Sequence, residues 1–285
     1  MKNQIRVYSL ETGNFKADGG AMFGVVPKAM WERVYPADEN NLCSCACRCL
    51  LVDTGDKKIL IDSGIGDKLD PDYARFYYFF GEDSLLKSLK QIGLAPEDIT
   101  DVILTHLHFD HCGGTTNFDA QGNSQIVFYK ANIWASKLQW DWAMSPNRRE
   151  EPVYLKENLE PLARSSRLKL VEKPFFLTPN VELRFFNGHT KGLISVFVNL
   201  GERRLVFAGD LLPAIPYIRL SFTAAYDIFP LTSIEEKEAF LNELYDNQDL
   251  LFLQHDINSE ACSLKMTPKG IRENKILKVD EISQI

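Results

Sequence analysis

Short apolar runs separated by turns recur along the chain and predict a protein with many short strands. Runs over 101–105, 181–186, 193–199 and 203–208 have the length of buried strands, and a hairpin is expected around 46–62. Helical patterns are fewer. One covers 84–92, with Ser84 as its N-cap and Gly93 as its stop, and another starts near Thr232. Strands mixed with helices in this way indicate an α/β protein.

Four cysteines alternate with other residues at the start of the expected hairpin: Cys43, Cys45, Cys47 and Cys49. Side chains two residues apart on a strand are separated by about 7 Å, too far to close around one zinc ion with bonds of about 2.3 Å. The same spacing disfavours disulfides between neighbours. We therefore expect a buried strand with free thiols, as in a reducing compartment. Cys112 directly follows His111 and is interpreted either as a small loop residue or as an oxidation-sensitive thiol near the metal site.

Composition predicts one globular domain over 1–285. The chain has 285 residues, of which 45% are hydrophobic, enough to bury a large core. No run of 18 apolar residues occurs, and the first residues lack the apolar core of a signal peptide, so we expect a cytoplasmic protein without membrane contact. The net charge of −7 argues against nucleic acid as a partner.

The histidines carry the strongest chemical signal. Three of the five, with an aspartate, fall within the six residues His106-Leu-His108-Phe-Asp110-His111, directly after the expected strand over 101–105. Imidazole and carboxylate groups are the usual ligands of zinc and related ions. The other candidate ligands, His189, Asp210 and His255, also follow apolar runs. Side chains at strand ends can gather at one edge of a sheet, so a metal site is expected there.

This His-x-His-x-Asp-His motif, together with Leu60-Ile-Asp62-Ser-Gly64, resembles the metallo-β-lactamase superfamily in its hydrolase branch. The resemblance covers nearly the whole chain and implies a four-layer αβ/βα sandwich with two divalent metal ions at one edge of the paired sheets. It implies that Asp62 orients a metal-bound histidine without binding metal itself. The implied ligands are His106, His108 and His189 for the first ion, Asp110, His111 and His255 for the second, and Asp210 as the bridge.

Two further segments, 20–28 and 225–232, resemble the N-acyl-homoserine lactonase-like and methyl parathion hydrolase-like branch. That likeness implies hydrolysis by a metal-bridging hydroxide, with Asp110 and Asp210 as catalytic residues and Asp110 passing a proton to the leaving group. A lactone or ester is the first substrate prediction, led by N-acyl-homoserine lactone. Phosphotriester cleavage is the alternative, and a non-hydrolytic redox or binding metalloprotein is third. Zinc is expected, although manganese, iron, cobalt and nickel accept the same ligands.

One position departs from the lactonase pattern. Lactonases of this fold carry a tyrosine three residues after the bridging aspartate, whereas this chain has Pro213. Tyr217 or Tyr226 could take over its role. Met22, Phe23 and some aromatic residues of 73–80 are predicted to line an apolar substrate pocket or a dimer contact. A homodimer is suggested by the resemblance alone.

Overall fold

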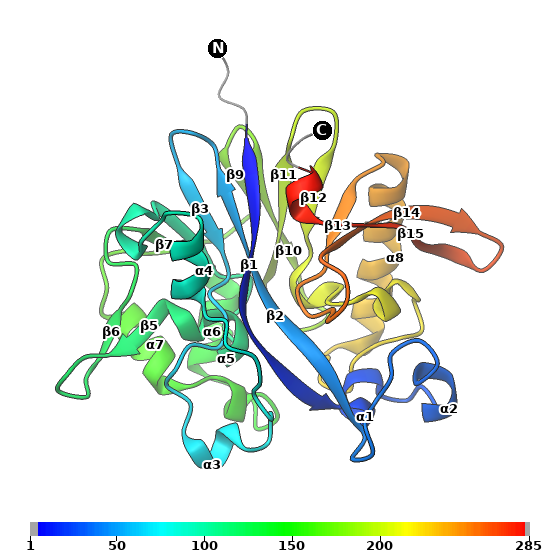
Figure 1. Ribbon diagram of the computed structural model, residues 1–285, viewed down its shortest axis with the longest axis horizontal. Helices are drawn as coiled ribbons and strands as arrows, with labels where there is room; N and C mark the ends of the chain where they lie inside the picture. The colour runs from blue at the N-terminus through cyan, green and yellow to red at the C-terminus, as the bar shows by residue number, and fades with distance from the viewer. Residues whose placement is uncertain (1–4, 283–285) are drawn as a thin grey trace.

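The structure is a computed structural model that describes residues 5–282, and two mixed β-sheets pack face to face in its middle (Figure 1). The first sheet has the order β1-β2-β3-β4-β7-β8 and the second β15-β14-β13-β12-β11-β10-β9. The strands of the first sheet are β1 (Arg6–Asp18), β2 (Leu42–Asp53), β3 (Lys58–Ile61), β4 (Asp101–Ile103), β7 (Asn132–Ser136) and β8 (Leu168–Val171). Those of the second are β9 (Phe175–Thr178), β10 (Val181–Phe186), β11 (Leu193–Asn199), β12 (Arg204–Phe207), β13 (Leu250–Phe252), β14 (Ala261–Thr267) and β15 (Gly270–Leu277). A small hairpin, β5 (Thr116–Phe118) and β6 (Ser124–Ile126), stands apart.

Helices cover the outer face of each sheet. The helices are α1 (Gly19–Phe23), α2 (Lys28–Trp31), α3 (Pro71–Ala74), α4 (Leu85–Gln91), α5 (Phe109–Cys112), α6 (Lys137–Met144), α7 (Lys156–Ala163), α8 (Pro230–Asp246) and α9 (Val279–Ile282). Apolar residues of α4, α6 and α7 pack on the first sheet, and those of α8 pack on the second (Figure 1). A third apolar cluster fills the space between the sheets, with Ile61 and Ile103 facing residues such as Phe207 and Phe252. The layers are therefore helix, sheet, sheet and helix, which confirms the predicted sandwich.

Most predicted elements are present, and the shifts have local causes. Strands β10 and β11 have the predicted bounds, and Ser84 caps α4 by accepting a hydrogen bond from the backbone N–H of Lys87. Helix α8 begins at Pro230, because proline suits the first turn of a helix. Strand β4 ends at Ile103, two residues early, where the chain turns toward the histidines.

The structure shows where the cysteines lie and whether a helix could span a membrane. Cys43, Cys45, Cys47 and Cys49 lie on β2, and all six cysteines are buried and free, which confirms the structural interpretation. Within 5–282, no helix has the length and apolar character needed to cross a bilayer.

Candidate metal centre

The seven predicted ligands lie at strand ends of both sheets. His106, His108, Asp110 and His111 follow β4, the last two on the short helix α5. His189 follows β10, Asp210 follows β12 in a 3-10 turn (Gly209–Leu211), and His255 follows β13. The structure thus brings together side chains that are up to 149 residues apart, from His106 to His255.

Glycines let the loop of α5 approach its neighbours closely. A Cβ atom on Gly113 would lie 1.9 Å from the carbonyl oxygen of Ile65, and one on Gly114 would lie 2.1 Å from that of Ser63. The backbone N–H of Ser63 also donates a 2.8 Å hydrogen bond to the carbonyl of His111. Any side chain at these glycines would push α5 away from 63–65, so the glycines set the position of Asp110 and His111.

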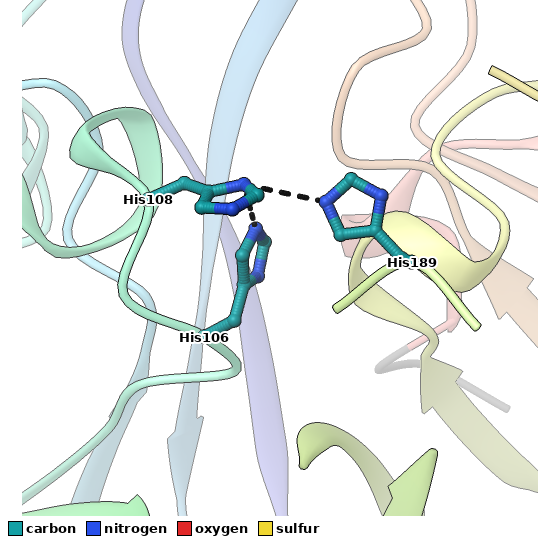
Figure 2. A group of neighbouring side chains, drawn as sticks. All are labelled: His106, His108 and His189. Carbon is teal, nitrogen blue, oxygen red and sulfur yellow. Dashed lines mark hydrogen bonds between the residues drawn. The ribbon is translucent and has the colours of Figure 1, made fainter. Parts of the chain in front are cut away.

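The first group of donor atoms consists of three histidine nitrogens that point toward one another (Figure 2). His108 Nδ1 lies 3.1 Å from His106 Nε2 and 3.3 Å from His189 Nε2, and all three residues are buried. Zinc–nitrogen bonds of about 2.0–2.1 Å in a tetrahedron place two ligand atoms about 3.3 Å apart. These spacings fit an ion bound by His106, His108 and His189.

The second group consists of Asp110, His111 and His255. His111 Nε2 lies 3.3 Å from His255 Nε2, while Asp110 Oδ2 lies 3.6 Å and 3.8 Å from these two nitrogens. Neutral imidazoles and one carboxylate are a suitable donor set for a divalent ion. The three side chains therefore form a second candidate metal site beside the first.

Asp210 lies between the two groups. Its Oδ1 is 3.4 Å from His111 Nε2 and 3.2 Å from His255 Nε2, whereas its Oδ2 is 3.4 Å from His189 Nε2. Oδ1 is buried without a hydrogen-bond partner, a costly state for a carboxylate oxygen unless a cation neutralises it. The residues present therefore fit a metal cofactor, with one oxygen of Asp210 directed to each group.

The local electrostatics agree with that fit. Burial, together with the neighbouring His111 and His108, holds the pKa of His106 well below its ordinary value, so the imidazole of this candidate ligand is neutral. Burial alone would raise the pKa of Asp210, but the surrounding histidines outweigh it and hold that pKa well below its usual range. Burial would lower the pKa of His111 and of His189, but the nearby carboxylates outweigh it: Asp110 and Asp210 raise the pKa of His111 well above its ordinary value, and Asp210 and Asp227 raise that of His189. A cation bound here would displace the protons of these two imidazoles, so metal binding would release protons.

Each histidine has a hydrogen-bond acceptor behind it. His111 Nδ1 is 2.9 Å from Asp62 Oδ2, and His255 Nδ1 is 2.8 Å from the carbonyl oxygen of Ala46. An acceptor at Nδ1 holds the proton there and leaves Nε2 bare to bind metal. Asp62 thus lies where the sequence placed it, beside a candidate metal-binding histidine.

Two of these acceptors were missed in the sequence. His189 Nδ1 is 2.9 Å from Asp227 Oδ1, and His108 Nε2 is 3.4 Å from Glu150 Oε1. Their partners lie 38 and 42 residues away along the chain, so spacing could not reveal them. The signal for Asp227 was its place within 225–232, a segment already noted for its resemblance to a narrower group of hydrolases.

A cavity of about 230 Å³ opens above the donor atoms. Met22, Tyr217 and Tyr226 line it as predicted, and Tyr77 is the member of the aromatic segment 73–80 that reaches it. Phe23 does not line it. Its ring is fully buried between Trp31 and Tyr217, on which it stacks with centroid distances of 5.0 and 5.7 Å, so it supports the wall from behind. The other apolar lining residues are Phe15, Ala17, Cys45, Phe109, Val153, Pro213, Ala214 and Ile228.

Comparison with known proteins agrees with this geometry. The model of the metallo-beta-lactamase superfamily matches residues 44–255, which include all seven candidate ligands. The chain belongs to this superfamily. This result confirms the family that the histidine motif predicted, and the metallo-beta-lactamase fold is the sandwich described above.

Relatives of this metallo-beta-lactamase superfamily protein are metal-dependent hydrolases. An N-acyl homoserine lactonase of Bacillus cereus is 29% identical over 248 residues, covering 81% of this chain and 89% of the relative. The solved structure of a probable metal-dependent hydrolase from Staphylococcus aureus is 29% identical, has a TM-score of 0.87 and covers 97% of this chain and 98% of its own. A dizinc quorum-quenching lactonase bound to its product has a TM-score of 0.79 at 22% identity, covering 98% and 97%, a likeness of fold alone. The protein is a metal-dependent hydrolase, as predicted.

Proposed function

We propose that the protein is a binuclear metal-dependent hydrolase that opens a lactone ring, with an N-acyl-homoserine lactone as the leading substrate. The observation that carries the proposal is the position of Asp210, which directs one carboxylate oxygen to each of two donor groups under an apolar cavity. The first group would be His106, His108 and His189, and the second Asp110, His111 and His255. The choice of substrate is supported by the sequence similarity to the N-acyl homoserine lactonase of Bacillus cereus.

Two divalent ions, zinc in our proposal, would supply an activated water and an electrophilic contact for the substrate's carbonyl oxygen. Residues of the chain would bind the substrate, exclude bulk water and transfer the proton. The apolar wall, with Phe15, Met22 and Ile228, would hold the acyl chain and keep bulk water away. Asp110, which lines the cavity, would carry a proton from the activated water to the ring oxygen as the carbon–oxygen bond breaks. The product is a hydroxy acid that leaves as its carboxylate.

We propose Tyr226 as the residue that replaces the lactonase tyrosine lost at Pro213. The hydroxyl of Tyr217 already donates a 2.6 Å hydrogen bond to the carbonyl of Met22, so it is committed to the cavity wall. Tyr226 lines the same cavity and meets the ring of His189 edge to face at 6.0 Å. Its hydroxyl would donate to the carbonyl oxygen of the substrate beside the first donor group.

A paired assay on protein of known metal content tests the substrate. We expect an N-acyl-homoserine lactone to be opened with kcat/KM of about 10⁴ M⁻¹s⁻¹ or more, the lower range of ordinary enzymes. A paraoxon-type phosphotriester is the comparison substrate under the same conditions. His108→Ala should lose metal and hydrolysis together. Faster phosphotriester turnover, or no turnover of the lactone by fully loaded protein, would refute the proposed substrate.

Tyr226→Phe tests the carbonyl contact. Removal of one hydrogen-bond donor that acts in the transition state should lower kcat by about 100- to 1,000-fold with metal content unchanged. Tyr129→Phe is the matched control, because Tyr129 is 56% exposed and does not line the cavity. Equal activity of the two variants would exclude Tyr226 from this role.

A further inference from the structure

A second, larger hollow lies away from the metal centre. It is a groove of about 750 Å³ bounded by the end of α2, the segment 218–222, one face of α8 and the β14–β15 hairpin. These elements lie on the same side of the molecule in Figure 1. None of the seven candidate metal ligands lines the groove. The proposed hydrolysis gives it no role.

The groove is basic although the protein is acidic. Arg33, Arg219, Lys269 and Arg272 line it, against the single acidic residue Glu238. In the part of the chain that the structure describes, none of these four cations forms an ion pair with a carboxylate. Four unpaired positive charges around one hollow in a chain of net charge −7 indicate an anionic ligand.

Two of the cations are close enough to repel each other. Arg219 and Arg272 are half-buried, and burial followed by the charge of Arg219 lowers the pKa of Arg272, although the neighbouring Glu273 acts in the opposite direction. The guanidinium of Arg219 also lies 5.4 Å from the ring centroid of Phe222, which fixes it against the groove wall. A bound carboxylate would relieve the repulsion and accept hydrogen bonds from both planar guanidinium groups.

The remaining wall of the groove is apolar and open to solvent. Met30 is 57% exposed, Met266 is 52% exposed and Val34 is 37% exposed, and all three line the groove. Methionine side chains adapt their shape to flexible apolar ligands. A ligand with a charged head alone would leave this surface uncovered, so an acyl chain fits the remainder of the groove.

We propose that this groove binds an amphipathic carboxylate, with its headgroup at Arg219 and Arg272 and its acyl chain along Met30, Val34 and Met266. Two sources supply this chemistry: a free fatty acid and, if the proposed lactonase function holds, the ring-opened N-acyl-homoserine. Binding in the groove does not depend on metal, so it can be tested independently of hydrolysis.

Calorimetric titration of the full chain with laurate, as the metal-loaded protein and as His108→Ala, tests the proposal. We expect one site that persists in His108→Ala, because a carboxylate held by the metal centre would disappear there. Decanoate should bind about 15-fold more weakly than laurate, since each buried methylene contributes about four-fold. Inorganic phosphate should bind far more weakly than laurate. A parallel titration with N-dodecanoyl-homoserine decides whether the groove also accepts the second source.

Charge variants locate the site. Arg219→Gln combined with Arg272→Gln should weaken laurate binding at least 10-fold, and Glu238→Gln should strengthen it. Lys90→Gln is the matched control, because Lys90 is an exposed cation on α4 that does not line the groove. The proposal is overturned if laurate does not bind, if binding is lost in His108→Ala, if the double variant binds as tightly as Lys90→Gln, or if phosphate alone binds as tightly as laurate.

Discussion

Replacement of Asp62 by asparagine should weaken metal binding through the tautomer of His111. Asp62 is fully buried, and its Oδ2 accepts hydrogen bonds from Thr105 Oγ1, His111 Nδ1 and Gln254 Nε2 at 2.8, 2.9 and 3.0 Å. Its Oδ1 accepts from the backbone N–H of Thr105 at 2.7 Å. An asparagine must therefore direct its NH₂ group at existing donors, whichever way its amide turns.

The least costly orientation leaves the oxygen on the backbone N–H of Thr105, because that donor cannot change. The NH₂ group then faces His111 Nδ1, and the imidazole can accept from it only by moving its own proton to Nε2. That nitrogen lies 3.3 Å from His255 Nε2 and 3.4 Å from Asp210 Oδ1, in the middle of the second donor group. A protonated Nε2 cannot bind metal. Loss of such an outer partner typically costs about 10- to 100-fold in metal affinity, or about 1.4–2.7 kcal/mol.

Competition with a chelating dye measures this affinity, and elemental analysis gives the number of ions per chain. Asp101→Asn is the control. Asp101 is also a buried carboxylate, with hydrogen bonds from Lys57 Nζ, Thr100 Oγ1 and Trp134 Nε1 at 2.8–2.9 Å, but none of its partners is a candidate ligand. Both variants should lose about 1–3 kcal/mol of unfolding free energy in the presence of chelator, because a buried acceptor no longer matches all of its donors. Unchanged metal affinity in Asp62→Asn, or an equal loss in Asp101→Asn, would refute the reasoning.

Three further predictions concern folding and reactivity. Gly113→Ala should destabilise the protein and reduce its metal content together, because the added Cβ would clash with the carbonyl oxygen of Ile65. Urea unfolding and elemental analysis measure the two effects. Wild-type stability and wild-type metal content in this variant would contradict the role of the close contact. Burial lowers the pKa of Lys237 to about 8 from 10.5, so between these values the unfolded chain holds more protons and stability rises with pH. The unfolding free energy of the wild type should therefore rise by up to about 1.4 kcal/mol per pH unit relative to that of Lys237→Met, as measured by urea unfolding at pH 7 and 9.5. The same difference in unfolding free energy at both pH values would argue against a lowered pKa of Lys237. Cys112 should resist a thiol reagent until the chain unfolds, because burial raises its pKa to about 12; rapid reaction of the native protein would show otherwise.

That last prediction corrects an expectation drawn from sequence. Cys112 follows His111 directly, and this proximity suggested an oxidation-sensitive thiol near the metals, beside the alternative of a small loop residue. In the structure its Sγ points away from the donor atoms and donates to the carbonyl of Leu107, in the core beneath the first sheet. Adjacent residues on the one-turn helix α5 point in different directions, so neighbourhood in the chain did not mean neighbourhood in the site.

Features encoded by neighbouring residues could be predicted from the sequence, whereas contacts made only by tertiary packing could not. Strands such as β10 and β11 could be predicted because their apolar runs are bounded by turns, and the histidine motif is contiguous. Glu150 could not be found this way, because its role comes from four hydrogen-bond donors, Trp142, Asn147, Tyr154 and Thr190, that converge on it only in the fold. Phe23 was assigned to the pocket because a glycine-rich apolar segment carries no sign of which side chain turns inward.

The candidate metal-binding atoms come from both sheets, so metal binding should affect the stability of the whole fold. His106, His108, Asp110 and His111 follow a strand of the first sheet, whereas His189, Asp210 and His255 follow strands of the second. Each donor group takes members from both sides: His189 joins His106 and His108, and His255 joins Asp110 and His111. A cation in either group would therefore connect the two sheets at one edge, where Asp210 otherwise holds a buried oxygen without a partner. Because ligands that bind only the folded chain stabilise it, metal should raise the unfolding free energy of the whole sandwich and not of one half.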